Sequence, residues 1–145
     1  KFRKVRDIQD VFVAGKKFEY LTERQLSYKD LETLPVMCLE GNTSTRAYVE
    51  GFLRENGVHL QPEFELATSD MLIRFAMRGF GIAGVAEDFA LEAMEKGEIF
   101  RLHFDREIPK RHFCIVTDEK VPMTAAARRF LDLLEDKCTS DKNKT

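Results

Sequence analysis

The stretch that decides the fold class is VMCLEGNTSTR, residues 36–46. It opens with four apolar residues, passes through a hydroxyl-rich turn at 41–45, and leads into a segment whose apolar residues share one helical face. Those apolar residues are Tyr48, Val49, Phe52 and Leu53. A short buried strand, a turn and an amphipathic helix in this order form the unit from which α/β layered domains are built.

The same alternation continues on both sides of this stretch. It predicts strands at 11–14, 36–39, 61–66, 82–86, 99–104 and 113–117. It predicts helices at 27–34, 44–56, 69–78, 87–96 and 124–136, with Thr124 as the N-cap of the last one. We therefore expect a three-layer α/β fold with a mostly parallel central sheet, in which 36–39, 64–66 and 82–85 share one sheet.

The composition is that of one globular domain. The chain has 145 residues, of which 43% are hydrophobic and 33% charged, so a folded core is expected rather than disorder. The formal net charge is −2, and acids and bases are interspersed, which argues against direct binding of DNA by this chain. No apolar run approaches the ~18 residues of a membrane span, and no apolar segment of a signal peptide follows the basic N-terminus.

The cysteine and histidine patterns predict neither a disulfide framework nor a metal site. The three cysteines are Cys38, Cys114 and Cys138, and the first two lie in strand-like runs where we expect buried, reduced thiols. The histidines have no metal-ligand spacing. A reducing, cytoplasmic location therefore fits best, and we expect no metal and no cofactor.

The run 79–84, GFGIAG, matches the dinucleotide-binding pattern G-x-G-x-x-G by letter. That pattern needs a strand before it and a helix after it, whereas here a helix precedes and a strand follows. Gly79 is better explained as a helix C-cap, and Gly81 and Gly84 as small residues in a tightly packed strand. We find no nucleophile, general base or metalloprotease motif either, so no residue is assigned a catalytic role and the chain is not expected to be an enzyme.

The hydroxyl turn Thr43–Thr45 is the most informative polar feature of the chain. One of its hydroxyl groups suffices for a plain N-cap, but three exceed what a cap needs. Spare hydroxyls at a helix N-terminus suit a carboxylate or phosphate, so a cap alone and a cap with a ligand site both remain open. A second such place is Thr68–Ser69, where the neighbouring Asp70 disfavours an anion. Both turns are expected at the carboxyl ends of strands, where α/β sheets bind ligands.

Four segments together resemble the effector-binding domain of LysR-type transcriptional regulators. They are 36–46, 65–70, 78–85 and the closing stretch 113–134, and the resemblance runs from about residue 5 to residue 135. It implies a fold similar to type 2 periplasmic binding proteins, in which two crossing strands join two α/β subdomains and a small effector binds between them.

The resemblance also implies a division of the chain. Residues 1–138 would be a fragment of the effector-binding domain, with 11–117 as the second subdomain and 11–14 and 113–117 as its crossing strands. Residues 118–138 would return to the first subdomain as the C-terminal helix, and the polar tail 139–145 is expected to be disordered. Most of the first subdomain and the DNA-reading helix-turn-helix would be absent from this chain.

The implied site residues are Thr43, Ser44 and Thr45, the end of the glycine-rich strand at Val85 and Ala86, and Thr68. Relatives usually carry proline where this chain has Ala86. The expected partner is a small anionic effector, which Arg46 could contact unless it serves in packing. The family also implies a homo-oligomer that contacts DNA only through the absent domain and does not enter a membrane. In a truncated chain, apolar residues of the last helix around Phe130 and Leu134 would then be partly exposed.

Two other functions remain to be distinguished. A solute-binding protein of a transport system shares this fold, and an enzyme can use the same scaffold. The sequence upstream would discriminate, because a helix-turn-helix favours a regulator and a signal peptide favours transport.

Overall fold

The computed structural model describes the backbone of residues 1–142 and the side chains of residues 1–134. It divides into two compact units, which are described separately. The larger unit is Gln9–Pro109, and the smaller combines Lys1–Ile8 with the chain from Lys110 onward.

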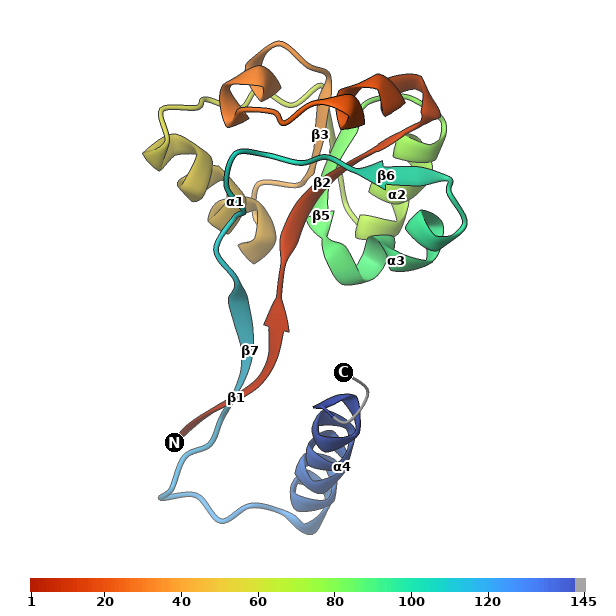
Figure 1. Ribbon diagram of the computed structural model, residues 1–145. Coiled ribbons are helices and arrows are strands. Elements are labelled where there is room, and N and C mark those ends of the chain that lie inside the picture. Colours follow the sequence, from red (N-terminus) through yellow and green to blue (C-terminus); the bar gives the residue numbers. More distant parts are fainter. Residues whose placement is uncertain (143–145) are drawn as a thin grey trace. The chain divides into compact units, whose positions relative to one another are not determined.

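A mixed five-stranded sheet forms the centre of the larger unit, in the order β4-β3-β5-β2-β6 (Figure 1). The strands are β2 (Asp10–Gly15), β3 (Val36–Leu39), β4 (Phe64–Leu66), β5 (Ile82–Ala86) and β6 (Ile99–Arg101). The three expected strands β4, β3 and β5 share the sheet and run parallel, which confirms the α/β prediction. β2 and β6 add antiparallel pairs, so the sheet is less parallel than expected, and two of its strands are shorter than predicted.

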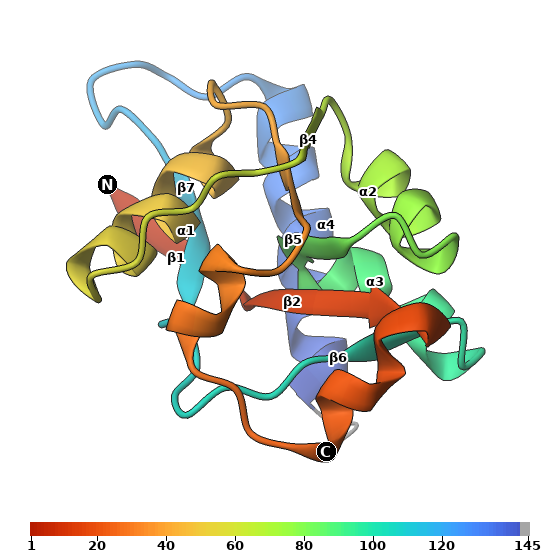
Figure 2. The ribbon, with the colours of Figure 1, turned by 90° about the horizontal axis from the view of Figure 1, so that it is seen from above.

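Helices cover both faces of this sheet. In Figure 2, α1 (Ser44–Glu55) lies on the opposite side of β3 from α2 (Ser69–Met77) and α3 (Glu87–Glu95). Two short 3-10 helices, η1 (Lys16–Glu23) and η2 (Tyr28–Glu32), bury side chains in the same core as α1. The alternation of β2 explains the two cores, because Phe12 and Ala14 pack on the α1 side and Val11 and Val13 on the α2–α3 side.

The helix ends follow the predicted capping residues. Ser27 and Asp30 form a capping box at η2, and Thr43 and Thr68 cap α1 and α2. After α1, α2 and α3 the chain turns at glycines with positive φ, which are Gly57, Gly79 and Gly97. A helix precedes and a strand follows the glycine-rich run 79–84, as expected, so it is not a dinucleotide fingerprint.

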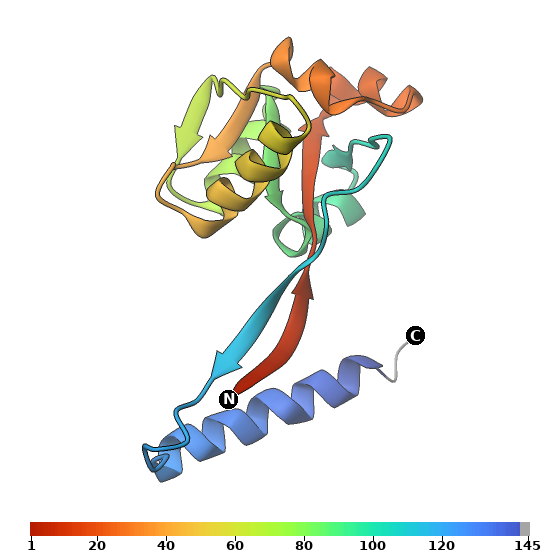
Figure 3. The same cartoon turned by 90° about the vertical axis from the view of Figure 1, so that its left-hand side faces the viewer.

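The smaller unit contains an antiparallel ribbon and a helix (Figure 3). β1 (Phe2–Ile8) pairs with β7 (Arg111–Val116), and α4 (Ala125–Lys142) begins after Thr124, whose hydroxyl accepts a bond from the Ala127 N–H. The segments expected as crossing strands thus lie in different sheets: 113–116 pairs with β1, and 11–14 belongs to the five-stranded sheet. β1 escaped prediction because most of its side chains are exposed on both faces, so no apolar alternation marks it.

Two further expectations need correction. α4 continues through 139–142, where a disordered tail was expected; residues 143–145 lie outside the described part. Cys38 is buried, and burial raises the pKa of its thiol to about 11, which fits an inert reduced thiol. Cys114 is exposed, because the ribbon buries neither of its faces at that position. The Cys138 side chain lies outside the described side chains.

The described part of the chain has neither a membrane-spanning helix nor a cluster of metal-ligating side chains. Within residues 1–142, no helix combines the length and hydropathy needed to cross a membrane. The described side chains also contain no cluster of three histidine, cysteine or acidic groups that could hold a metal ion.

Candidate functional site

Three helix N-termini meet one edge of the five-stranded sheet. β3, β4 and β5 are parallel, so their carboxyl ends lie at the same edge, and each strand leads through a short turn into α1, α2 or α3. We call this the carboxyl edge and define it as residues 40–45, 67–70 and 86–88. It brings together every site residue predicted from the sequence except Val85, which directly precedes it. N–H groups of a first helical turn lack intrahelical acceptors, so such an edge can bind polar ligands.

Thr43 is the N-cap of α1, and its hydroxyl is engaged twice. Its Oγ1 accepts from the Arg46 backbone N–H at 3.2 Å and donates to the Glu40 carbonyl oxygen at 3.0 Å. The cap is therefore confirmed, and the hydroxyl shapes the turn. Ser44 is exposed and Thr45 is half-buried in the first turn that follows. These two residues belong to the first turn of α1, whose N–H groups lack intrahelical backbone acceptors.

The second and third turns of the edge are more acidic. Thr68 caps α2 by accepting from the Met71 N–H at 3.3 Å, and Asp70 lies in the first turn. Ala86 is the N-cap residue of α3 and has no capping side chain, while Glu87 and Asp88 follow it. The first turn of α1 has no acidic residue. Of the three helix N-termini, that of α1 is therefore the most favourable for an anion.

The end of β5, which precedes α3, presents backbone groups and no polar side chain at the carboxyl edge. Val85 is fully buried in the core on the α2–α3 side, so its side chain cannot contact a ligand at the edge. Ala86 is 8% exposed, and the following Glu87 N–H donates to the Gln9 carbonyl oxygen at 2.8 Å. The predicted contribution of Val85 is therefore limited to its peptide groups, because a β-strand points successive side chains to opposite faces.

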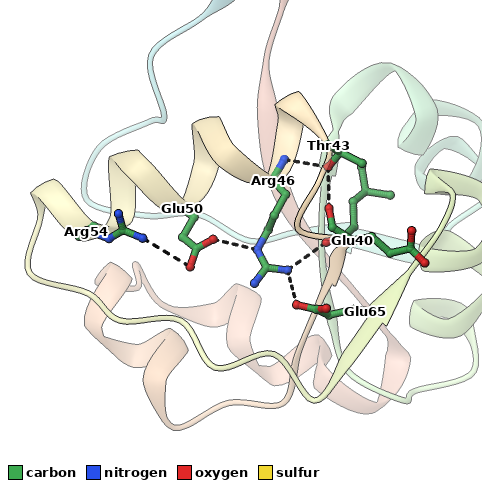
Figure 4. A network of polar contacts seen from close by, with 7 residues as sticks. Glu40, Thr43, Arg46, Glu50, Arg54 and Glu65 are labelled. Atoms are coloured by element: carbon green, nitrogen blue, oxygen red, sulfur yellow. Dashed lines mark hydrogen bonds and ion pairs between the residues drawn. The ribbon is translucent and has the colours of Figure 1, made fainter.

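Arg46 is buried, and two of the three nitrogens of its guanidinium make contacts within the protein (Figure 4). Its Nη1 donates to the Leu39 carbonyl oxygen at 3.0 Å and to Glu65 at 2.8 Å, and its Nε donates to Glu50 at 3.2 Å. Burial lowers the pKa of Arg46, but the hydrogen bond to Glu65 and the nearby negative charges outweigh it and raise the pKa above its usual value. The packing alternative for Arg46 is thus the one that the contacts support.

The two acidic partners of Arg46 were not identified from the sequence. Glu50 stands four residues after Arg46, a spacing that places both on one helical face and could have revealed the pair. Glu65 lies 19 residues away on β4, so only the pairing of β3 with β4 brings it near.

Comparison with known proteins agrees with this architecture. A family model described as LysR substrate binding domain matches residues 1–139. No curated protein sequence matches the chain.

Several solved structures share the fold. The CcmR regulatory domain from Synechocystis PCC6803, in complex with 2-PG, is 17% identical with a TM-score of 0.81, over 92% of this chain and 64% of that one. The bromide ion-bound regulatory domain of HypT from Salmonella typhimurium is 15% identical with a TM-score of 0.73, over 97% and 65%. The regulatory domain of CrgA, a LysR-type transcriptional regulator from Neisseria meningitidis, is 17% identical with a TM-score of 0.69, over 95% and 68%. The chain thus spans about two thirds of each.

Proposed function

We infer the function from one premise: this chain belongs to the LysR substrate-binding domain family. As a member, it is part of an effector-sensing domain and not a solute carrier of a transport system. We propose that the whole protein is a transcriptional regulator, that it works in the cytoplasm, and that it reads DNA through a helix-turn-helix outside this chain. The net charge of −2 and the interspersed charges support a role away from DNA. The family's role in ligand binding, together with the absence of a catalytic motif in the sequence, supports a non-enzymatic function.

We propose that the effector is a small anion that binds at the first turn of α1. The observation that carries this proposal is the hydroxyl turn, which caps a helix whose first turn has no acidic residue, at an edge where three helices begin. An oxyanion there would accept charge-assisted hydrogen bonds from groups already in place. The bromide-bound HypT domain shows that a relative of this fold accepts an anion.

A double replacement tests the hydroxyl turn. In a protein that includes the upstream part of the effector domain, Thr43→Ala with Ser44→Ala is expected to weaken binding of the best small carboxylate at least about tenfold. The Ser44 hydroxyl can donate to the charged group, a bond that contributes about 1.5–3 kcal/mol, and the Thr43 hydroxyl holds the turn in place. Isothermal titration against a carboxylate library measures the effect. Thr33→Ala is the matched control, since the Thr33 hydroxyl makes the same bond to the carbonyl three residues back, at 3.0 Å, away from the edge. Equal affinity in the double variant would leave the turn as a helix cap only.

We further propose that the chain self-associates. Phe64 on β4, Phe75 on α2 and Phe80 in the turn after α2 form a cluster of three aromatic rings, whose centroids lie 5.2–6.3 Å apart. Phe64 is 40% and Phe80 50% exposed. An aromatic groove beside Phe64 is lined by Arg74, Phe75, Met77, Arg78 and Phe80. Aromatic residues and arginine are the types enriched at protein interfaces. In the smaller unit, Phe130 is also exposed, at 61%.

Sedimentation velocity checks this proposal. The chain is expected to show concentration-dependent association, and Phe80→Ser is expected to weaken it by about tenfold or more, as loss of a buried aromatic anchor does at interfaces. Phe89→Ser is the control, because Phe89 is 58% exposed on α3, outside the aromatic groove. A strict monomer at high concentration, or equal effects of the two variants, would contradict the proposal.

A further inference from the structure

Arg46 is a charged side chain in an unusual place. Together with Asp10, it is one of two charged residues that are buried in the described part of the chain. Removing an arginine from water is costly unless its donors are satisfied. Here the guanidinium bonds one backbone carbonyl and two carboxylates, which compensate for its burial. A hydrophobic side chain could fill the same space but could not make these bonds.

The contacts of Arg46 connect the two ends of the turn that precedes α1. Its backbone N–H donates to Thr43 Oγ1, and Thr43 is bonded back to the Glu40 carbonyl through both its N–H, at 3.1 Å, and its hydroxyl. Its guanidinium reaches the Leu39 carbonyl at the end of β3. Arg46 therefore contacts both ends of the turn: Leu39 at the end of β3 and Thr43, the N-cap of α1.

Arginine is required for this arrangement because its donors point in fixed directions. Nη1 serves Leu39 and Glu65 while Nε serves Glu50, so a planar fork connects β3, β4 and α1 at once. A lysine ammonium carries the same charge at the end of a flexible stem and cannot reproduce the fork. Replacing Arg46 by lysine would therefore keep the charge and remove the fork, so the effects of charge and of geometry can be distinguished by experiment.

We propose that Arg46 is a positioning residue of the effector turn, residues 40–45: it holds the first turn of α1 in its binding orientation and does not contact the effector. This inference rests on the proposed function of that turn. Its guanidinium is committed to Leu39, Glu50 and Glu65, and the side chain is 8% exposed. Glu65 acts in two ways. Its carboxylate bonds Arg46, and its negative charge offsets the positive charge of Arg46 near the carboxyl edge, which makes the edge less favourable for an anion.

The first experiment needs no ligand. Amide hydrogen exchange of residues 1–145 is measured by NMR for Arg46→Lys, Arg46→Gln and the control Arg54→Gln. Arg54 is on the same helix but is exposed, with its side chain 67% accessible, and reaches only Glu50 at 3.8 Å. Both position-46 variants should exchange the amides of residues 43 and 46 about tenfold faster than the wild type, because a buried polar contact is lost, while Arg54→Gln should not. Unchanged exchange in Arg46→Lys would overturn the inference.

The second experiment separates positioning from charge in a protein that includes the upstream part of the effector domain. It uses inorganic phosphate at constant ionic strength and follows the amide shifts of Ser44 and Thr45. Positioning predicts that Arg46→Lys weakens phosphate binding about as much as Arg46→Gln, by about tenfold. Glu65→Gln, which keeps a hydrogen-bond acceptor but removes a negative charge, should instead strengthen binding two- to threefold, about 0.4–0.7 kcal/mol. Wild-type affinity in Arg46→Lys would overturn positioning, and weaker binding in Glu65→Gln would contradict the charge effect. If wild type shows no phosphate response, the proposed anion site fails, and the exchange rates alone decide the role of Arg46.

Discussion

A protein that carries this chain together with the upstream part of its effector domain is expected to bind its small carboxylate at least about a hundredfold more tightly than residues 1–145 alone. Small-molecule sites usually bury about 70–90% of the ligand surface. In the proposed site, the carboxyl edge would form one wall, made by the first turns of three helices. Bonds made there in contact with bulk water would contribute about 0.5–1.5 kcal/mol each when neutral, which is too little to offset the lost translational and rotational freedom of the ligand.

Parallel calorimetric titrations of the two proteins with the same carboxylate check this expectation. Adding the double variant Thr43→Ala/Ser44→Ala in the longer protein shows whether the gain uses the hydroxyl turn. Equal affinity of the two proteins would mean that residues 1–145 hold a complete site, and the proposal of a site shared with an upstream subdomain would be wrong.

Gly81→Ala is expected to lower the free energy of unfolding by about 1–3 kcal/mol, the usual cost of overpacking a filled core. A Cβ at this position would lie 2.5 Å from the Pro35 carbonyl oxygen and 3.2 Å from Met37 Cγ. The Pro35 oxygen cannot move freely, because it accepts the Ile82 N–H at 2.8 Å and so holds β3 against β5. The clash would therefore disturb the parallel pair from which the carboxyl edge is built.

Gly51→Ala is the matched control for this prediction. Gly51 lies within α1, and a Cβ there would meet nothing within 4 Å. Alanine in a helix interior is more stable than glycine by about 0.5–1 kcal/mol, so this variant should unfold at higher urea concentration than wild type. Urea unfolding followed by circular dichroism compares the two. Equal stability of Gly81→Ala and wild type would show that β5 can shift at no cost.

The sequence alone was enough for the layered architecture of the larger unit. The strand at 36–39, the cap at Thr43 and the stop at Gly57 are all local features, and each was predicted because capping, periodicity and glycine conformations depend on neighbours within a few residues. The same holds for rejecting the run 79–84 as a nucleotide site, since that depended only on the order of helix and strand.

What the tertiary structure alone decided are the pairings between distant segments and the burial that follows from them. β1 pairs with β7 across more than a hundred residues, and Cys114 is exposed because the resulting ribbon buries neither of its faces at that position. Glu65 contacts Arg46 because β4 pairs with β3 in parallel. Arg46, a candidate for contact with the effector, is therefore buried and bonded within the protein. Local propensity carries no information on such contacts, because they form only when folding brings separate strands into one sheet, and the burial they create then determines which charges stay free to meet a ligand.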